Sequence, residues 1–236
     1  MKPLEPSAHV SETHLKSHLD VIFEQAKTRA VDHKKLLDEA IKNGEDVSQK
    51  DREFREREYA HLNNMGNLQA RLETYRNKNK VKTTNAAKEK ELETNKSDNS
   101  TTLGLHLRAA GEFRHNRHFQ AHHIICSKHP GHAASRLILF LNKMEYGIND
   151  PDNGCWLPTK HKYAIGTPHS KAVGHRYVHT DDYARWVHGF VKRGESSKQS
   201  LQLQLDMLKT LLLDLNEPTA KKFLTEKGLT DLRTHS

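Results

Sequence analysis

The stretch FQAHHIIC at residues 119–126 places two adjacent histidines, His122 and His123, in an apolar setting. The pattern predicts a strand or an extended segment. Neighbouring side chains of an extended segment point to opposite sides, so the two rings cannot easily bind the same ion. The segment instead suits a division of roles, in which one imidazole binds a metal ion and the next faces a substrate.

A second histidine pair, His175 and His179, lies in a segment, residues 172–193, that predicts a helix ended by Gly194. On a helix, the four-residue spacing puts both rings on one face, which is a metal-chelating geometry. Either pair alone is more often an ordinary surface or core pair, and the ordered combination is what indicates a site. His169, just before the second pair, is an alternative ligand.

Histidines in such a combination suit one divalent metal ion. Three neutral imidazoles leave coordination positions open for phosphate and water, as a catalytic site requires. A divalent ion polarises a phosphoryl oxygen, and a further imidazole can take a proton from water near pH 7. The ion prefers neutral rings, so acid should abolish binding. Zn, Mg, Ni and Mn all remain open as its identity.

The segments around these histidines predict a small domain over residues 103–236. Turn signals at residues 148–160 surround a short strand centred on Trp156. The predicted helices, defined by apolar periodicity and by glycine or proline boundaries, lie at residues 132–146, 172–193 and 197–215, with a last short one opened by Pro218.

The N-terminal part of the chain predicts a helical accessory region, residues 1–78. Apolar residues at three- and four-residue steps predict two helices over residues 11–78, separated by Asn43 and Gly44. Their apolar stripe is thin, so the pair needs a partner or the other domain for stability. Residues 79–102 are almost entirely polar and predict a linker.

Charge is distributed unevenly along the chain, which has a formal net charge of +8. Residues 1–100 hold 19 lysines and arginines against 18 acidic residues, whereas residues 101–236 hold 19 against 12. A basic surface suits a polyanion, because bound phosphates release counterions. Side chains near the histidines that could hold phosphates, or could equally be a solvated face, are Arg114, Arg117, Lys128 and Arg176.

Two cysteines, Cys126 and Cys155, exclude a disulfide framework and a four-cysteine zinc site. One disulfide between them stays open, and free thiols are expected in a reducing compartment. No apolar run approaches the ~20 residues that a membrane helix needs. The first residues also lack the apolar stretch of a signal peptide, so we expect a protein made in the cytoplasm.

Three segments taken in order resemble a known family. QAHHIIC, then YGINDPDNGCWLP, then GHRYVHTDDYARWV, are similar to the AHH nucleases of the HNH/endonuclease VII superfamily, over about residues 113–192. That superfamily is often found as toxin modules of bacterial conflict systems. The resemblance implies a ββα-metal fold, in which a two-stranded hairpin and a helix clamp one divalent ion. The expected fold class is therefore α+β and mostly helical, with an N-terminal helical hairpin, this small nuclease domain and C-terminal helices.

The resemblance also implies roles for individual residues. His122 would be the first metal ligand and His123 the general base that activates water. Asn153 would be the central asparagine, which orients the base or its loop. The remaining metal ligands would be His175 and His179, with His169 as the alternative; Tyr183 matches an aromatic residue that usually follows. Cys126 stands where the family commonly has proline, a departure that should alter only local packing.

The function that the resemblance implies is a metal-dependent endonuclease that hydrolyses DNA without sequence specificity. It further implies an antibacterial effector toxin, secreted by a specialised system and active in the cytoplasm of a target cell. The expected partners are DNA, a cognate immunity protein, and a chaperone or carrier that docks the N-terminal helices; no membrane is expected.

Other classes of function compete with this one. A phage or restriction-type endonuclease would keep the chemistry but lack a neighbouring immunity gene. A non-catalytic nucleic-acid-binding module would use the histidines for a structural metal with a closed set of four ligands. A pure interaction protein built on the N-terminal helices would bind metal without cutting any nucleic acid.

Overall fold

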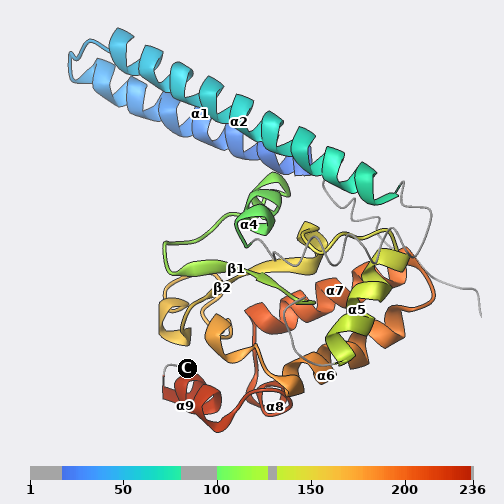
Figure 1. Cartoon of the computed structure of the whole chain (residues 1–236). Coiled ribbons are helices and arrows are strands. Elements are labelled where there is room, and N and C mark those ends of the chain that lie inside the picture. Colours follow the sequence, from blue (N-terminus) through green and yellow to red (C-terminus); the bar gives the residue numbers. More distant parts are fainter. Residues whose placement is uncertain (1–17, 81–99, 127–131, 235–236) are drawn as a thin grey trace, which may run out of the picture. The chain divides into compact units, whose positions relative to one another are not determined.

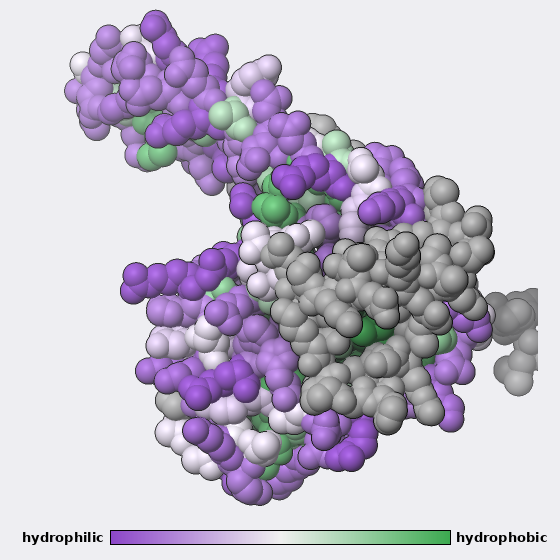
Figure 2. Space-filling view, in the orientation of Figure 1, coloured by the Kyte–Doolittle hydropathy of each residue, from purple (hydrophilic) through white to green (hydrophobic). Residues whose placement is uncertain are grey.

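A computed structural model describes residues 18–80, 100–126 and 132–234 (Figure 1). The chain divides into two compact units, residues 1–58 and residues 59–236. Both units are largely helical, and the described residues contain a single two-stranded sheet. The α+β, mostly helical fold class predicted from the sequence is confirmed. On the face shown in Figure 2, hydrophilic residues cover most of the coloured surface.

The first unit is a pair of helices. Helix α1 spans His18–Lys42 and helix α2 spans Ser48–Lys80, so α2 continues into the second unit. Gly44 turns the chain between them with a φ of +75°, a conformation that glycine adopts without strain. The predicted helical hairpin is therefore confirmed over these residues, whereas residues 11–17 of its first helix lie outside the described part.

Polar contacts join α1 to the start of α2. The Arg29 guanidinium donates to both oxygens of Glu58, at 2.6 to 3.2 Å. The His33 ring stacks on Phe54 with ring centroids 3.7 Å apart, and its Nε2 lies 3.3 Å from Asp51 Oδ1. Such part-exposed ion pairs contribute little net stability. Among the described side chains of the first unit, the buried hydrophobic ones are Ile22 and Ala40, which agrees with the thin apolar stripe predicted from the sequence.

The second unit is built on a small antiparallel sheet. Strand β1, Phe119–His123, pairs with β2, Gly154–Pro158, so that His122 lies opposite Cys155. Helix α4, Ser100–Ala109, packs on both strands (Figure 1). Buried side chains between helix and sheet, with Trp156 packed against them, are Leu103, Leu107 and Ala121. The structure adds α4 to the elements predicted from the sequence.

The main core lies among the remaining helices. These are α5 His132–Lys143, α6 Asp181–Val191, α7 Lys198–Leu213, α8 Glu217–Ala220 and α9 Glu226–Thr234. Helix α7 contributes a fully buried row at three- and four-residue steps, namely Leu201, Leu205, Leu208 and Leu212. Helix α9 was not predicted. No helix among the described residues is long and apolar enough to cross a membrane.

The helix predicted at residues 172–193 is wrong in its first part. His175–Tyr177 form a single 3-10 turn, and α6 begins only at Asp181. Thr180 explains the late start: its backbone is extended, with φ −126° and ψ 159°, and its hydroxyl accepts a hydrogen bond from Tyr183 N. A threonine in this role caps the N-terminus of a helix, so residues before it lie outside that helix.

The end of α2 contacts the loop that precedes β2, within the second unit. Arg76 donates to Asp150 at 2.9 and 3.0 Å and to Asp152 at 3.3 Å. Burial alone would lower the pKa of Arg76, but the hydrogen bonds and charge of Asp150 outweigh it and raise the pKa. This ion pair fixes the loop that carries the asparagines of the site. Residues 81–99, most of the predicted linker, lie outside the described part.

Candidate metal centre and active site

Three histidines from separate segments gather beside the sheet. His122 lies on β1, His175 on the 3-10 turn and His179 just before α6; one ring nitrogen from each lies within 4.8 Å of the others. The Nε2 atoms of His175 and His179 are 2.9 Å apart. The structure thus brings together the three histidines predicted as ligands, although a 3-10 turn and the residues that follow it, rather than one helix face, present the second pair.

Tyr183 fixes which nitrogen of His122 carries the proton. The Tyr183 hydroxyl lies 3.0 Å from His122 Nε2 and donates to the Ile124 carbonyl at 3.1 Å. A hydroxyl has one proton, so Tyr183 accepts from His122 Nε2–H and leaves the lone pair on Nδ1. His122 is fully buried, and its Nδ1 has no hydrogen-bond partner among the described residues. A buried nitrogen lone pair of this kind suits a metal ion.

Gln120 plays the same part for His175. Its Oε1 lies 2.9 Å from His175 Nδ1, so this nitrogen donates and Nε2 keeps the lone pair that faces His179. Burial, and then the charge of His179, lower the pKa of His175 to about 4; burial is also the main cause that lowers the pKa of His122. The rings are therefore neutral at pH 7, the form that binds metal. The donor set fits one divalent ion.

His123 points away from this cluster, as alternation along a strand requires. Its Nε2 lies 2.9 Å from Asn149 Oδ1. Because an amide oxygen only accepts, His123 donates through Nε2, and its Nδ1 is the nitrogen that can take a proton. The ring is buried, with 6% of its surface exposed. This arrangement suits a base beside, but not within, a metal centre.

Asn149 is itself held at its backbone. Its N–H donates to the Tyr75 hydroxyl of α2 at 2.9 Å, and its carbonyl accepts from His106 Nδ1 at 2.7 Å. A Cβ on Gly147 would lie 2.0 Å from the Tyr75 hydroxyl oxygen, so only glycine leaves room for this contact. The amide that holds His123 is thus positioned by two helices, α2 and α4.

Asn153 ties two backbone segments together. Its Oδ1 accepts from Ile125 N at 2.8 Å, and its Nδ2 donates to the carbonyls of Ile125 and Ile148 at 3.0 and 2.9 Å. The side chain is fully buried. Two roles were predicted for Asn153, orienting the base or orienting its loop. The side chain of Asn153 contacts the loop backbone, whereas the ring of His123 contacts Asn149.

The other predicted residues lie at varying places. His169 is absent from the three-histidine cluster and lies against His115, with ring centroids 5.0 Å apart, so the structure does not bring this alternative ligand to the centre. Arg114 and Arg117 are exposed and precede β1, and Arg176 lies over the Tyr177 ring at 5.4 Å. Lys128 lies outside the described residues.

Two residues of the site were missed from the sequence. Gln120 stands two positions before His122, on the same side of the strand, so alternation could have found it. Asn149 lies in a stretch whose residues predicted only turns, and its neighbours in the sequence do not distinguish it from Asn153. Both cysteines are free, with Cys155 buried, which agrees with the expectation of free thiols.

Acid should destabilise the metal-free protein as the pH falls from about 6.5 toward 4. The folded state holds the pKa of His175 at about 4, against 6.5 as the ordinary value. Between these values the unfolded chain binds more protons, so acid favours unfolding. Urea midpoints in chelator at pH 7 and pH 5 measure the loss, which should shrink in His175→Gln. An equal loss of stability in the wild-type and His175→Gln proteins would contradict the assignment of this loss to His175.

One comparison with known proteins gives a match. Residues 103–219 match the family model described as AHH, a nuclease family of the HNH/ENDO VII superfamily with conserved AHH. No curated protein and no solved structure matches the chain. The matched residues include Ala121-His122-His123, both strands, the three-histidine cluster and α6. Through this domain the chain belongs to the AHH nuclease family, and it is an HNH-type endonuclease that hydrolyses phosphodiester bonds.

Proposed function

We propose that this endonuclease cleaves DNA with the help of one divalent metal ion and without sequence specificity. The observation that carries the proposal is the convergence of three histidine side chains, one of which has a buried nitrogen lone pair, in a cluster whose strand residue, His122, is next to His123. A ribbon of two strands followed by α6 supplies the frame of a ββα nuclease site.

Each residue has a defined role in this proposal. His122, His175 and His179 hold the ion, which when bound polarises the phosphoryl oxygen and stabilises the leaving 3′ oxygen. His123 takes the proton of the attacking water on its Nδ1. Asn149 holds the ring of His123 through its Nε2–H, so that Nδ1 is the basic nitrogen. Tyr183 and Gln120 orient the ligands, as hydrogen-bond partners of metal-binding histidines commonly do.

The basic charge of the nuclease half of the chain suits a polyanionic substrate, and DNA is the polyanion that we propose. The excess of lysine and arginine over acidic residues lies almost wholly after residue 100. Contacts from Arg114, Arg117 and Arg176 would go to phosphates, which position a strand but carry no sequence information. Three nitrogen ligands favour Zn or Ni over Mg and Mn, which prefer oxygen ligands.

The test is cleavage of supercoiled plasmid by protein stripped with EDTA and then given Zn²⁺, Ni²⁺, Mn²⁺ or Mg²⁺ singly. We expect no cleavage before addition and nicked or linear product with at least one ion. Cleavage that persists in EDTA would refute the metal requirement. A folded protein that binds DNA but cuts it with none of the four ions would favour the non-catalytic binding module instead.

Tyr183→Phe should weaken metal affinity by about 10- to 100-fold, the range found when a partner of a metal-binding histidine is removed. The substitution removes one oxygen and leaves the tautomer of His122 unfixed. Competition with a chromophoric chelator measures the affinity. Excess metal should restore most cleavage, since no ligand is lost. Loss of cleavage that excess metal does not restore, in a protein with unchanged melting temperature, would count against this role.

We further propose that the nuclease serves as an antibacterial effector toxin. The support is the AHH family match together with an accessory helical pair, α1 and α2, that could dock a carrier or chaperone. An acidic immunity protein would then cover the basic site in the producing cell, and secretion by a specialised system would deliver the toxin to a competitor's cytoplasm. Expression in a bacterial cytoplasm should be toxic for the wild type and harmless for His123→Ala. Equal growth with both soluble proteins would count against the toxin, and a neighbouring immunity gene separates a toxin from a phage or restriction-type enzyme.

A further inference from the structure

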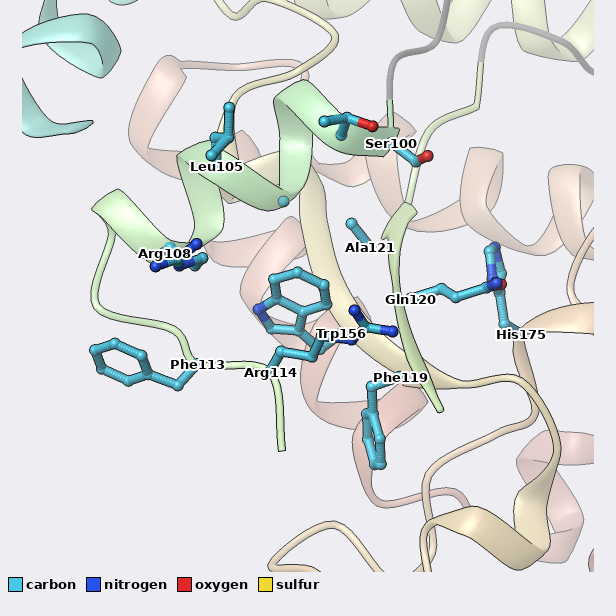
Figure 3. Close-up of a pocket in the computed structure, with 12 residues that line it drawn as sticks. Ser100, Leu105, Arg108, Phe113, Arg114, Phe119, Gln120, Ala121, Trp156 and His175 are labelled. Carbon is cyan, nitrogen blue, oxygen red and sulfur yellow. The ribbon is translucent and has the colours of Figure 1, made fainter. Parts of the chain in front are cut away.

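A groove of about 630 Å³ lies between α4 and β1 and reaches the candidate metal centre (Figure 3). Its wall on the β1 side includes Gln120 and Ala121, and His175 lines it as well. Gln120 also accepts the hydrogen bond that fixes the tautomer of His175. The groove and the metal centre are therefore contiguous, and they share two side chains.

Two aromatic side chains line the groove. Trp156 is half-buried, and its Nε1–H donates to the Glu112 carbonyl at 3.1 Å. A Cβ on Gly104 would lie 3.0 Å from Trp156 Cη2, so the ring packs closely on the α4 backbone and is held in place. Phe113 lines the same groove and is exposed. A fixed indole and an exposed phenyl ring in one groove form a platform on which bases can stack.

Two arginines line the same groove, Arg108 from α4 and Arg114 from the segment before β1 (Figure 3). Neither forms an ion pair with a carboxylate in the described part of the chain; Arg114 donates to the Arg117 carbonyl. Elsewhere, by contrast, Arg76 and Arg185 each pair with aspartate. Guanidinium groups that form no ion pair within the described residues, beside an aromatic platform, suit the phosphates of a nucleic acid strand.

We propose that this groove binds unpaired nucleotides that flank the scissile phosphate. Bases stack on Trp156 and Phe113, and the phosphates between them pair with Arg108 and Arg114. Bases inside a duplex are already stacked on their neighbours, so only single-stranded or locally opened nucleic acid can present them to the platform. The enzyme therefore prefers single strands, and supercoiled plasmid over relaxed duplex. That the groove lies beside the reacting phosphate rests on the proposed function, whereas the binding test does not require cleavage.

The test measures binding in EDTA, where the metal-dependent reaction is off. Fluorescence anisotropy compares a labelled short oligothymidylate with a duplex of the same length. We expect tighter binding of the single strand, and about tenfold weaker binding in Phe113→Ala, within the range for loss of one stacked base. Arg108→Gln with Arg114→Gln should also reduce the dependence of affinity on salt. Matched controls are Tyr59→Ala, whose ring is 70% exposed, and Arg185→Gln; both should bind like wild type.

Tryptophan emission gives a second readout that does not depend on these substitutions. The chain has two tryptophans, and Trp186 stacks on Phe223, with ring centroids 4.4 Å apart, rather than lining the groove. Oligothymidylate should quench Trp156 in Trp186→Phe protein and leave the emission of Trp156→Phe protein unchanged. Equal quenching in both, or equal affinity for single strand and duplex, would overturn the proposal. Binding with these properties but no plasmid cleavage would instead overturn the proposed function alone.

Discussion

His123→Ala protein is expected to lose about 10²- to 10⁴-fold in cleavage rate while it keeps its affinity for the metal ion. The range is what a positioned general base contributes. Metal affinity should persist because His123 lies on the opposite side of β1 from His122 and outside the three-histidine cluster. The measurement pairs single-turnover plasmid cleavage at saturating metal with a chelator competition on the same samples.

A comparison of two variants shows whether His123 acts in the reaction or only supports the structure. The ring is buried and donates to Asn149, so the variant leaves an amide oxygen unsatisfied, at a cost of about 1–3 kcal/mol. Asn149→Ala removes the same hydrogen bond but keeps the imidazole, and it should lose less activity than His123→Ala. A metal affinity that falls in His123→Ala as far as in His179→Ala would show that base and ligand are assigned the wrong way round.

His179→Ala protein is expected to lose metal and cleavage together. Its Nε2 lies 2.9 Å from His175 Nε2, and without it only two of the three clustered nitrogens remain. Affinity should fall more than 100-fold, beyond the range for residues that merely orient ligands. His179 is exposed, so the free energy of unfolding of the metal-free protein should change by no more than about 0.5 kcal/mol.

A matched variant isolates the effect of position. His188 is a partly exposed histidine on α6 and lies outside the cluster. His188→Ala should retain metal affinity and cleavage, so that loss in His179→Ala cannot be ascribed to removal of a histidine in general. Full metal binding by His179→Ala would contradict the ligand set and would reopen the case for His169.

The parts of the site that follow from local periodicity could be predicted from the sequence. Alternation along a strand separates His122 from His123, and the structure shows them on opposite sides. The proximity of His175 and His179 was also predicted, although the helix invoked for it was wrong. The 3-10 turn at His175–Tyr177 and the residues after it bring the two rings together instead. The start of α6 depends on the cap at Thr180.

The parts that depend on tertiary contacts could not be predicted. Asn149 is placed by Tyr75 and His106, which are far from it in the sequence. Helix α4 has a short apolar pattern interrupted by Gly104, and only its packing on Trp156 explains that glycine. The groove is likewise lined by separate segments of the chain, and no apolar pattern in the sequence indicates that these segments lie side by side. The family resemblance predicted the histidines, Asn153 and Tyr183 because they form a motif. It contained nothing about Gln120 and Asn149, which hold the rings of His175 and His123.

The most direct measurement is plasmid cleavage by wild-type and His123→Ala proteins, each saturated with the same divalent ion and each repeated in EDTA. We predict that only the wild-type protein with metal converts supercoiled plasmid to nicked or linear product. Undiminished cleavage by His123→Ala, or wild-type cleavage that EDTA does not reduce, would contradict the assignment of the reaction to this histidine centre.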